Sequence, residues 1–81
     1  MSESHNLAAE FPEFKGTIHN LKGTNAHFKK LFDRYQEVDR AVVRAEQRID
    51  LMSELDEENL RKERLHLKEE IYLILKAESA R

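Results

Sequence analysis

Apolar residues recur along the middle of this chain at alternating intervals of four and three positions. This spacing places the side chains on one side of an α-helix, because the helix completes a turn every ~3.6 residues. The pattern predicts a helix over residues 25–52 with a single apolar face. The residues of that face are Phe28, Leu31, Phe32, Tyr35, Val38, Val42, Ala45, Ile49 and Met52.

A second apolar stripe follows a polar break at residues 53–56, where Ser53 and Asp56 are both candidate caps for a helix over residues 57–78. Two long helices joined by a short turn hide their apolar faces by folding back on each other. We therefore predict an all-α fold, an antiparallel and coiled-coil-like helical hairpin with a short N-terminal helical segment. The second stripe contains Leu60, Leu67, Ile71 and Ile74, and Leu65 and Tyr72 form a smaller apolar shoulder beside it.

The N-terminal part is predicted to divide into a flexible stretch over residues 1–10 and a helix over residues 12–23. Pro12 suits the first turn of a helix, where its missing N–H is not needed. The hairpin domain is expected to cover residues 11–79, but its last helix should end before it reaches residues 12–27. Apolar side chains at Phe14, Ile18 and Leu21 would then lack an intrachain partner. We therefore expect a homo-oligomer, with a dimer favoured, in which this segment packs on a neighbour.

A short repeat places two glycines one heptad apart: Lys15-Gly16-Thr17 recurs as Lys22-Gly23-Thr24. Glycine inside a helix costs ~1 kcal/mol relative to alanine, so the pair needs a reason. In one interpretation Gly23 ends a short helix and Thr24 or Asn25 caps the next one. In the other, a second helix packs closely against the glycines. The cap is favoured.

Composition argues against most kinds of chemistry. The 81 residues include 14 Lys and Arg against 16 Asp and Glu, and no cysteine. The balance of charge disfavours general attraction to nucleic acid or to a membrane surface. No apolar run is long enough for a membrane span or a signal peptide, so we expect a cytoplasmic protein.

Enzymatic activity is not expected, because no pattern indicates a nucleophile, a catalytic pair or a phosphate-binding loop. The four histidines lack the spacing of metal ligands, so no metal site and no cofactor are predicted. These histidines are His5, His19, His27 and His66.

A nucleic-acid accessory function is the alternative to an interaction protein. A cluster of cations surrounds Phe28 and Phe32, which could stack on bases while the cations neutralise phosphates. Core packing explains both phenylalanines equally well, and the chain lacks a basic excess, so packing is favoured. The cations of this cluster are Lys22, Lys29, Lys30 and Arg34.

Two segments carry a resemblance to a known family. Residues 21–35, continuing to Val38-Asp39, and residues 62–72 together resemble the YdcH-like family of small bacterial proteins. The resemblance implies a coiled-coil-like helical hairpin with no established biochemical role, and it transfers no catalytic residue. The chain departs from the family at Ala26, where proline is common, and at Tyr35, where histidine is frequent.

Taken together, these patterns predict a non-catalytic, self-associating protein–protein interaction module, which could also bind an unidentified protein partner. The candidate interaction and packing residues are Phe14, Ile18, Leu21, Phe28, Leu31, Phe32, Tyr35, Leu65, Leu67, Ile71 and Tyr72.

Overall fold

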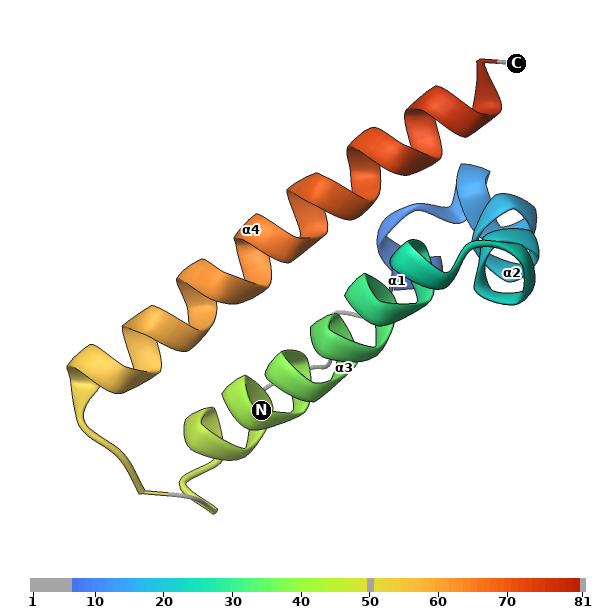
Figure 1. Cartoon of the computed structure of the whole chain (residues 1–81). Coiled ribbons are helices and arrows are strands. Elements are labelled where there is room, and N and C mark those ends of the chain that lie inside the picture. Colours follow the sequence, from blue (N-terminus) through green and yellow to red (C-terminus); the bar gives the residue numbers. More distant parts are fainter. Residues whose placement is uncertain (1–6, 50, 81) are drawn as a thin grey trace.

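A computed structural model describes residues 7–49 and 51–80 of the chain and shows helices joined by short connections (Figure 1). Helices α3 and α4 lie side by side and run in opposite directions, while α2 lies across the end of this pair that is remote from the turn. The predicted all-α hairpin is therefore confirmed. The elements are α1 (Leu7–Glu10), the 3-10 helix η1 (Pro12–Phe14), α2 (Lys15–Thr24), α3 (Ala26–Glu46) and α4 (Glu54–Ser79).

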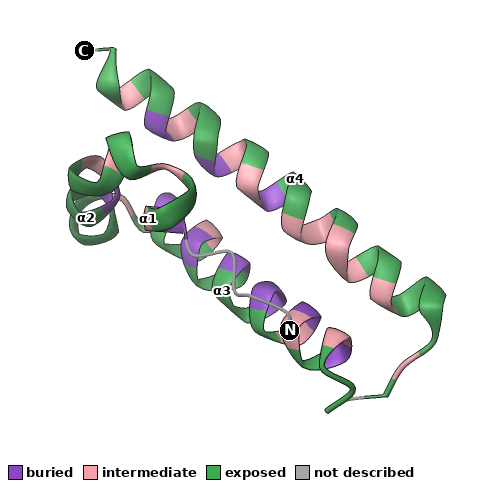
Figure 2. Ribbon diagram, turned by 180° about the vertical axis from the view of Figure 1, so that it is seen from behind, coloured by how far each residue is buried: buried purple, intermediate pink, exposed green. Residues whose placement is uncertain are grey.

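The hydrophobic core lies along the seam between α3 and α4. The buried residues of both helices occupy the sides that face each other, as Figure 2 shows. Burial of this apolar surface is the main favourable contribution to folding. The core contains Leu7, Ile18, Leu21, Phe28, Phe32, Tyr35, Val38, Val42, Leu67, Ile71 and Leu75.

The N-terminal segment packs on its own chain, so the expectation that it lacks an intrachain partner is wrong. Ile18 and Leu21 are 5% and 3% exposed in the isolated chain. The physical reason is length: α4 has 26 residues and α3 has 21, so α4 extends past the start of α3. Helix α2 folds back onto this extension instead of continuing α3. The segment therefore gives no reason to expect a second chain.

Residues 7–10, which belong to the stretch predicted to be flexible, form helix α1. Leu7 is 2% exposed and belongs to the core. The N–H of Phe11 donates to the carbonyl of Leu7 over 2.9 Å, which ties α1 to the next element. The remainder of the stretch predicted to be flexible, residues 1–6, lies outside the described residues.

The chain turns between α2 and α3 at Asn25, as the cap interpretation predicted. Asn25 is extended (φ −129°, ψ 105°), and its Oδ1 accepts a hydrogen bond from the N–H of Phe28 over 3.0 Å. This side chain therefore satisfies one of the unpaired amides at the start of α3. The alternative of a helix packed against the glycines is wrong, because a Cβ built on Gly16 or Gly23 would meet no atom within 4 Å.

Helix α3 ends at Glu46, six residues before the predicted end of the helix over residues 25–52. Arg48 adopts a left-handed conformation (φ 61°), and the N–H of Ile49 donates to the carbonyl of Arg44 over 2.9 Å. A second bond joins the N–H of Arg48 to the carbonyl of Ala45 (3.1 Å), which completes a Schellman motif. Ile49, predicted to be in the core stripe, is consequently 56% exposed.

Helix α4 begins at Glu54, three residues before the predicted start at residue 57. Of the two predicted caps, Ser53 is confirmed, because its Oγ accepts a hydrogen bond from the N–H of Asp56 over 3.1 Å. Asp56 itself lies inside the first turn of α4. The early start brings Leu55 into the helix. Acidic residues in the first turn are favourable at this positive end of the helix dipole.

The strained cap at Arg48 generates a first prediction. Arg48→Gly is expected to be more stable than Arg48→Ala by about 1 kcal/mol, because only alanine keeps a Cβ in the left-handed conformation. Both variants remove the ion pair between Arg48 and Glu57. The difference in stability between them therefore reports the effect of the backbone conformation at residue 48. Urea denaturation measures the difference. Equal stability would show that the left-handed residue does not limit the cap.

The core seam generates a second prediction. Ile71 is fully buried, so Ile71→Ala should lower the free energy of unfolding by ~2–5 kcal/mol through lost burial and the cavity that remains. Leu51→Ala, at a side chain that is 84% exposed, is the control and should change stability by less than about 0.5 kcal/mol. Similar effects of the two substitutions in chemical denaturation would contradict the assigned core.

Candidate interaction surface

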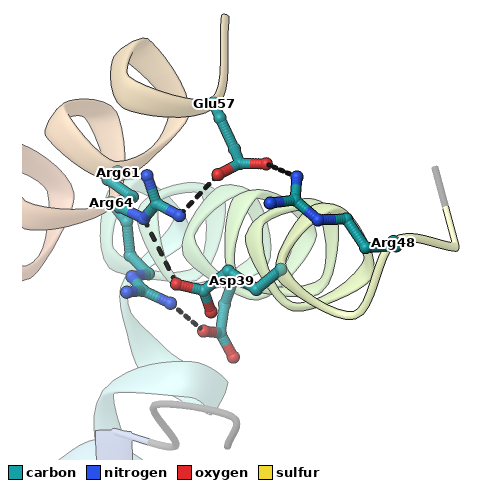
Figure 3. Close-up of polar contacts among 6 residues, drawn as sticks. Asp39, Arg48, Glu57, Arg61 and Arg64 are labelled. Atoms are coloured by element: carbon teal, nitrogen blue, oxygen red, sulfur yellow. Dashed lines mark hydrogen bonds and ion pairs between the residues drawn. The ribbon is translucent and has the colours of Figure 1, made fainter. Parts of the chain in front are cut away.

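Ion pairs connect α3 to α4 on one flank of the hairpin. Figure 3 shows Arg61 of α4 contacting Glu57 one turn earlier, while Arg48 reaches the same carboxylate from the turn. The Arg61–Glu57 distance is 2.7 Å and the Arg48–Glu57 distance is 3.5 Å. Arg61 also contacts Glu46 across the seam at 3.2 Å. Each exposed ion pair contributes little to stability. The pairs that cross the seam fit the observed alignment of α3 with α4.

The innermost ion pair joins Asp39 of α3 to Arg64 of α4. Arg64 Nη1 and Asp39 Oδ1 are 3.0 Å apart, and the two side chains are only 11% and 5% exposed (Figure 3). Burial, with a smaller contribution from the charge of Asp39, raises the pKa of the neighbouring Tyr35 to about 12. Tyr35 therefore stays neutral at physiological pH. The arrangement is a nearly buried polar cluster inside an apolar seam.

This buried pair generates a third prediction. Asp39→Ala should cost ~3–5 kcal/mol of stability, because it leaves a nearly buried guanidinium without its carboxylate. The double variant Asp39→Leu/Arg64→Met should recover most of that loss, since it leaves no buried charge. As a control, Asp33→Ala removes the exposed Lys29–Asp33 pair and should cost less than about 1 kcal/mol. A small effect of Asp39→Ala in urea denaturation would contradict this account.

The side of α4 that faces away from α3 carries large apolar side chains in contact with solvent. Leu55, Leu65 and Leu73 are 65%, 54% and 65% exposed, and Tyr72 is 36% exposed. At ~100° per residue they lie within about 100° of arc, opposite Leu67. We call this side the outer face of α4. Its exposed residues are Glu54, Leu55, Glu58, Lys62, Leu65, Glu69, Tyr72, Leu73 and Lys76.

A shallow groove of about 410 Å³ runs along the C-terminal part of this face. Phe11 forms one wall, with its ring centroid 5.3 Å from that of Tyr72, and Phe14 contacts the same tyrosine at 6.1 Å. The other residues that line the groove belong to α4 and are Lys68, Glu69, Tyr72 and Leu73. The N-terminal aromatic residues thus cover one side of Tyr72 and leave the other side open.

The structure divides the candidate interaction residues into two sets. Most of them fill the chain's own core, and only Leu65 and Tyr72 are exposed. Sequence reasoning missed the exposed Leu55 and Leu73, although their helical position opposite Leu67 was available as a signal. The buried candidates are Ile18, Leu21, Phe28, Phe32, Tyr35, Leu67 and Ile71, and the partly buried ones are Phe14 and Leu31.

The basic cluster suggested for nucleic acid is engaged within the chain. Phe28 and Phe32 are buried, so neither offers a face for base stacking, and the Lys22 ammonium lies 4.5 Å from the centre of the Phe32 ring. Lys29 pairs with Asp33 at 3.0 Å. Arg34 pairs with two carboxylates, Glu37 at 3.2 Å and Glu63 at 2.8 Å. Lys30 is exposed.

The histidines lie apart on the surface. His19, His27 and His66 are exposed, and His66 Nε2 is 3.1 Å from a carboxylate oxygen of Glu70. His5 lies outside the described residues. Within residues 7–49 and 51–80, no three His, Asp or Glu side chains form a group suited to a metal ion.

The hairpin turn also exposes apolar side chains, Ile49 and the 84% exposed Leu51. The turn therefore forms a second, smaller apolar surface beside the outer face of α4. In the described part of the chain, no helix combines the length and the apolar character that crossing a membrane requires.

The hairpin itself is the part of the chain that matches a known family. Residues 28–75, from the first turn of α3 to the last turns of α4, match the model of a protein family of unknown function, DUF465. The chain belongs to this family. The resemblance identified from the sequence is thereby confirmed.

Two curated relatives extend the match beyond the hairpin. The chain is 32% identical over 71 residues to "Uncharacterized protein YdcH" of Escherichia coli (strain K12) and of Shigella flexneri. The alignment covers 88% of this chain and 96% of each relative. No solved structure matches the chain. Family membership thus identifies the chain as one of a group whose function is uncharacterized.

Proposed function

We propose that this protein is a non-catalytic helical hairpin that functions as a protein–protein interaction module and self-associates through the outer face of α4. The observation that carries the proposal is the gathering of four large exposed apolar side chains on this one face. Single exposed leucines are ordinary on a protein surface, whereas several large apolar side chains along one helix face favour an interaction site.

The rest of the molecule supports this use of α4. The opposite side of the helix is occupied by α3, α1 and α2, so its hydrophobic positions are already packed. Helix α4 therefore serves two functions: one side holds the hairpin together and the other presents apolar surface to solvent. The rigid seam beneath the outer face keeps the exposed side chains in fixed positions, which lowers the entropic cost of binding.

Self-association generates a fourth prediction. Sedimentation velocity across the micromolar range should show the mass rising from the 9.6 kDa monomer towards a dimer. Leu65→Gln keeps a good helix former but removes apolar area from the centre of the face, and should raise the dissociation constant about tenfold.

The matched control is Leu51→Gln, which removes an exposed leucine from the turn and should leave association unchanged. Circular dichroism would show that both variants keep their helices. A 9.6 kDa mass at every concentration would refute self-association. A ligand of another class would then have to cover the outer face.

A further inference from the structure

From Glu58 to Lys76, the charged residues on the outer face of α4 alternate in sign, so the order of signs is inverted when this stretch is read in the reverse direction. Acidic Glu58 lies towards the N-terminal end and basic Lys76 towards the C-terminal end. Nearer the middle the order is inverted, with basic Lys62 before acidic Glu69. Leu65 lies near the centre of this pattern. A face with this arrangement is complementary to a reversed copy of itself and repels a copy aligned in parallel.

We propose that the partner is a second copy of this chain, whose α4 packs antiparallel on α4 about a two-fold axis near Leu65. This inference rests on the proposed self-association and adds the identity of the contact and its register. Under such an axis, Lys62 faces the partner's Glu69, and Glu58 faces the partner's Lys76. Each pair occurs twice, because a two-fold interface is isologous.

The apolar residues of the face agree with the same register. Leu55 faces the partner's Leu73, and Leu65 faces the same residue of the partner at the axis. The midpoints of the pairs formed by residues 55 and 73, 62 and 69, 65 and 65, and 58 and 76 fall between about 64 and 67. These positions lie within about 4.5 Å along a helix that rises ~1.5 Å per residue. With the axis at residue 65, Glu69 lies about 1.5 Å along the helix from the point opposite Lys62, and Leu73 lies about 3 Å from the point opposite Leu55. Lys76 lies about 6 Å from the point opposite Glu58, a distance that its long side chain spans. The three pairs are therefore compatible with one alignment.

On the second copy, the surface best suited to contact the apolar outer face of α4 is again the outer face of α4. The described large apolar side chains that are exposed lie either on the outer face of α4 or in the hairpin turn. The exposed side of α3 instead carries charged residues such as Lys30, Asp33 and Arg40. Pairing α4 with α4 buries apolar surface on both chains, whereas pairing α4 with α3 would bury it against charge.

Disulfide trapping tests the register directly, because the chain has no cysteine of its own. A disulfide requires Cβ atoms about 3.5–4.5 Å apart, a condition met by two copies of one residue only near the axis. Leu65→Cys should therefore form a covalent dimer under mild oxidation. Gln36→Cys, on the exposed side of α3, should remain monomeric on a denaturing gel.

A charge swap provides a second readout that does not depend on replacing Leu65. Lys62→Glu and Glu69→Lys should each raise the dissociation constant about tenfold. The double variant Lys62→Glu/Glu69→Lys should recover most of this loss, because the swapped charges face each other across the two-fold axis. Recovery is not complete, since the intrachain Lys62–Glu58 pair at 3.2 Å stays broken. Glu37→Lys on α3 is the control and should have no effect on association.

The outcomes separate this inference from the proposed function. Selective trapping through residue 65 and recovery in the double variant would support the antiparallel register. A dimer in sedimentation without selective trapping, or without recovery, would overturn the register and leave self-association standing. A monomer at all concentrations would overturn both.

Discussion

The burial of two apolar stripes against each other is the constraint on which this structure depends. A single amphipathic helix in water is unstable, so α3 and α4 persist because each covers the other's hydrophobic side. Val42 and Ile71, both fully buried, mark this seam. With no cysteine available for a disulfide, the chain relies on packing of this kind. The short N-terminal helices add to the same core where α4 extends beyond α3.

Polar groups within the seam select one alignment of the helices, since apolar side chains alone tolerate sliding. The pair between Asp39 and Arg64 is nearly buried, and a shifted register would separate these charges at a large desolvation cost. The helix caps at Asn25 and Ser53 also restrict the fold, because they set the points at which the chain changes direction. Each satisfies an amide at a helix start and so fixes where one helix ends and the next begins. A small number of polar contacts thus determine the register of α3 on α4 and the positions of the connections between helices.

The outer face of α4 has a different character from the seam beneath it. Its leucines are separated by charged residues of both signs. In composition it therefore resembles a modest protein–protein interface more than an exposed hydrophobic core. The family match covers residues 28–75 of the chain, which include most of this face. A stable hairpin with one remaining apolar side is consistent with a protein whose activity is to bind other chains.

The amino-acid sequence by itself determined the helices, their antiparallel pairing and the core positions from Phe28 to Ala45 and at Leu67 and Ile71, because hydrophobic periodicity is a local signal. It did not determine where α3 stops. The apolar spacing continues to Ile49 and Met52, while the left-handed cap at Arg48 depends on backbone hydrogen bonds. Only the tertiary structure decided that α2 folds back onto α4. Such contacts depend on the relative lengths and directions of whole helices, which no local pattern encodes.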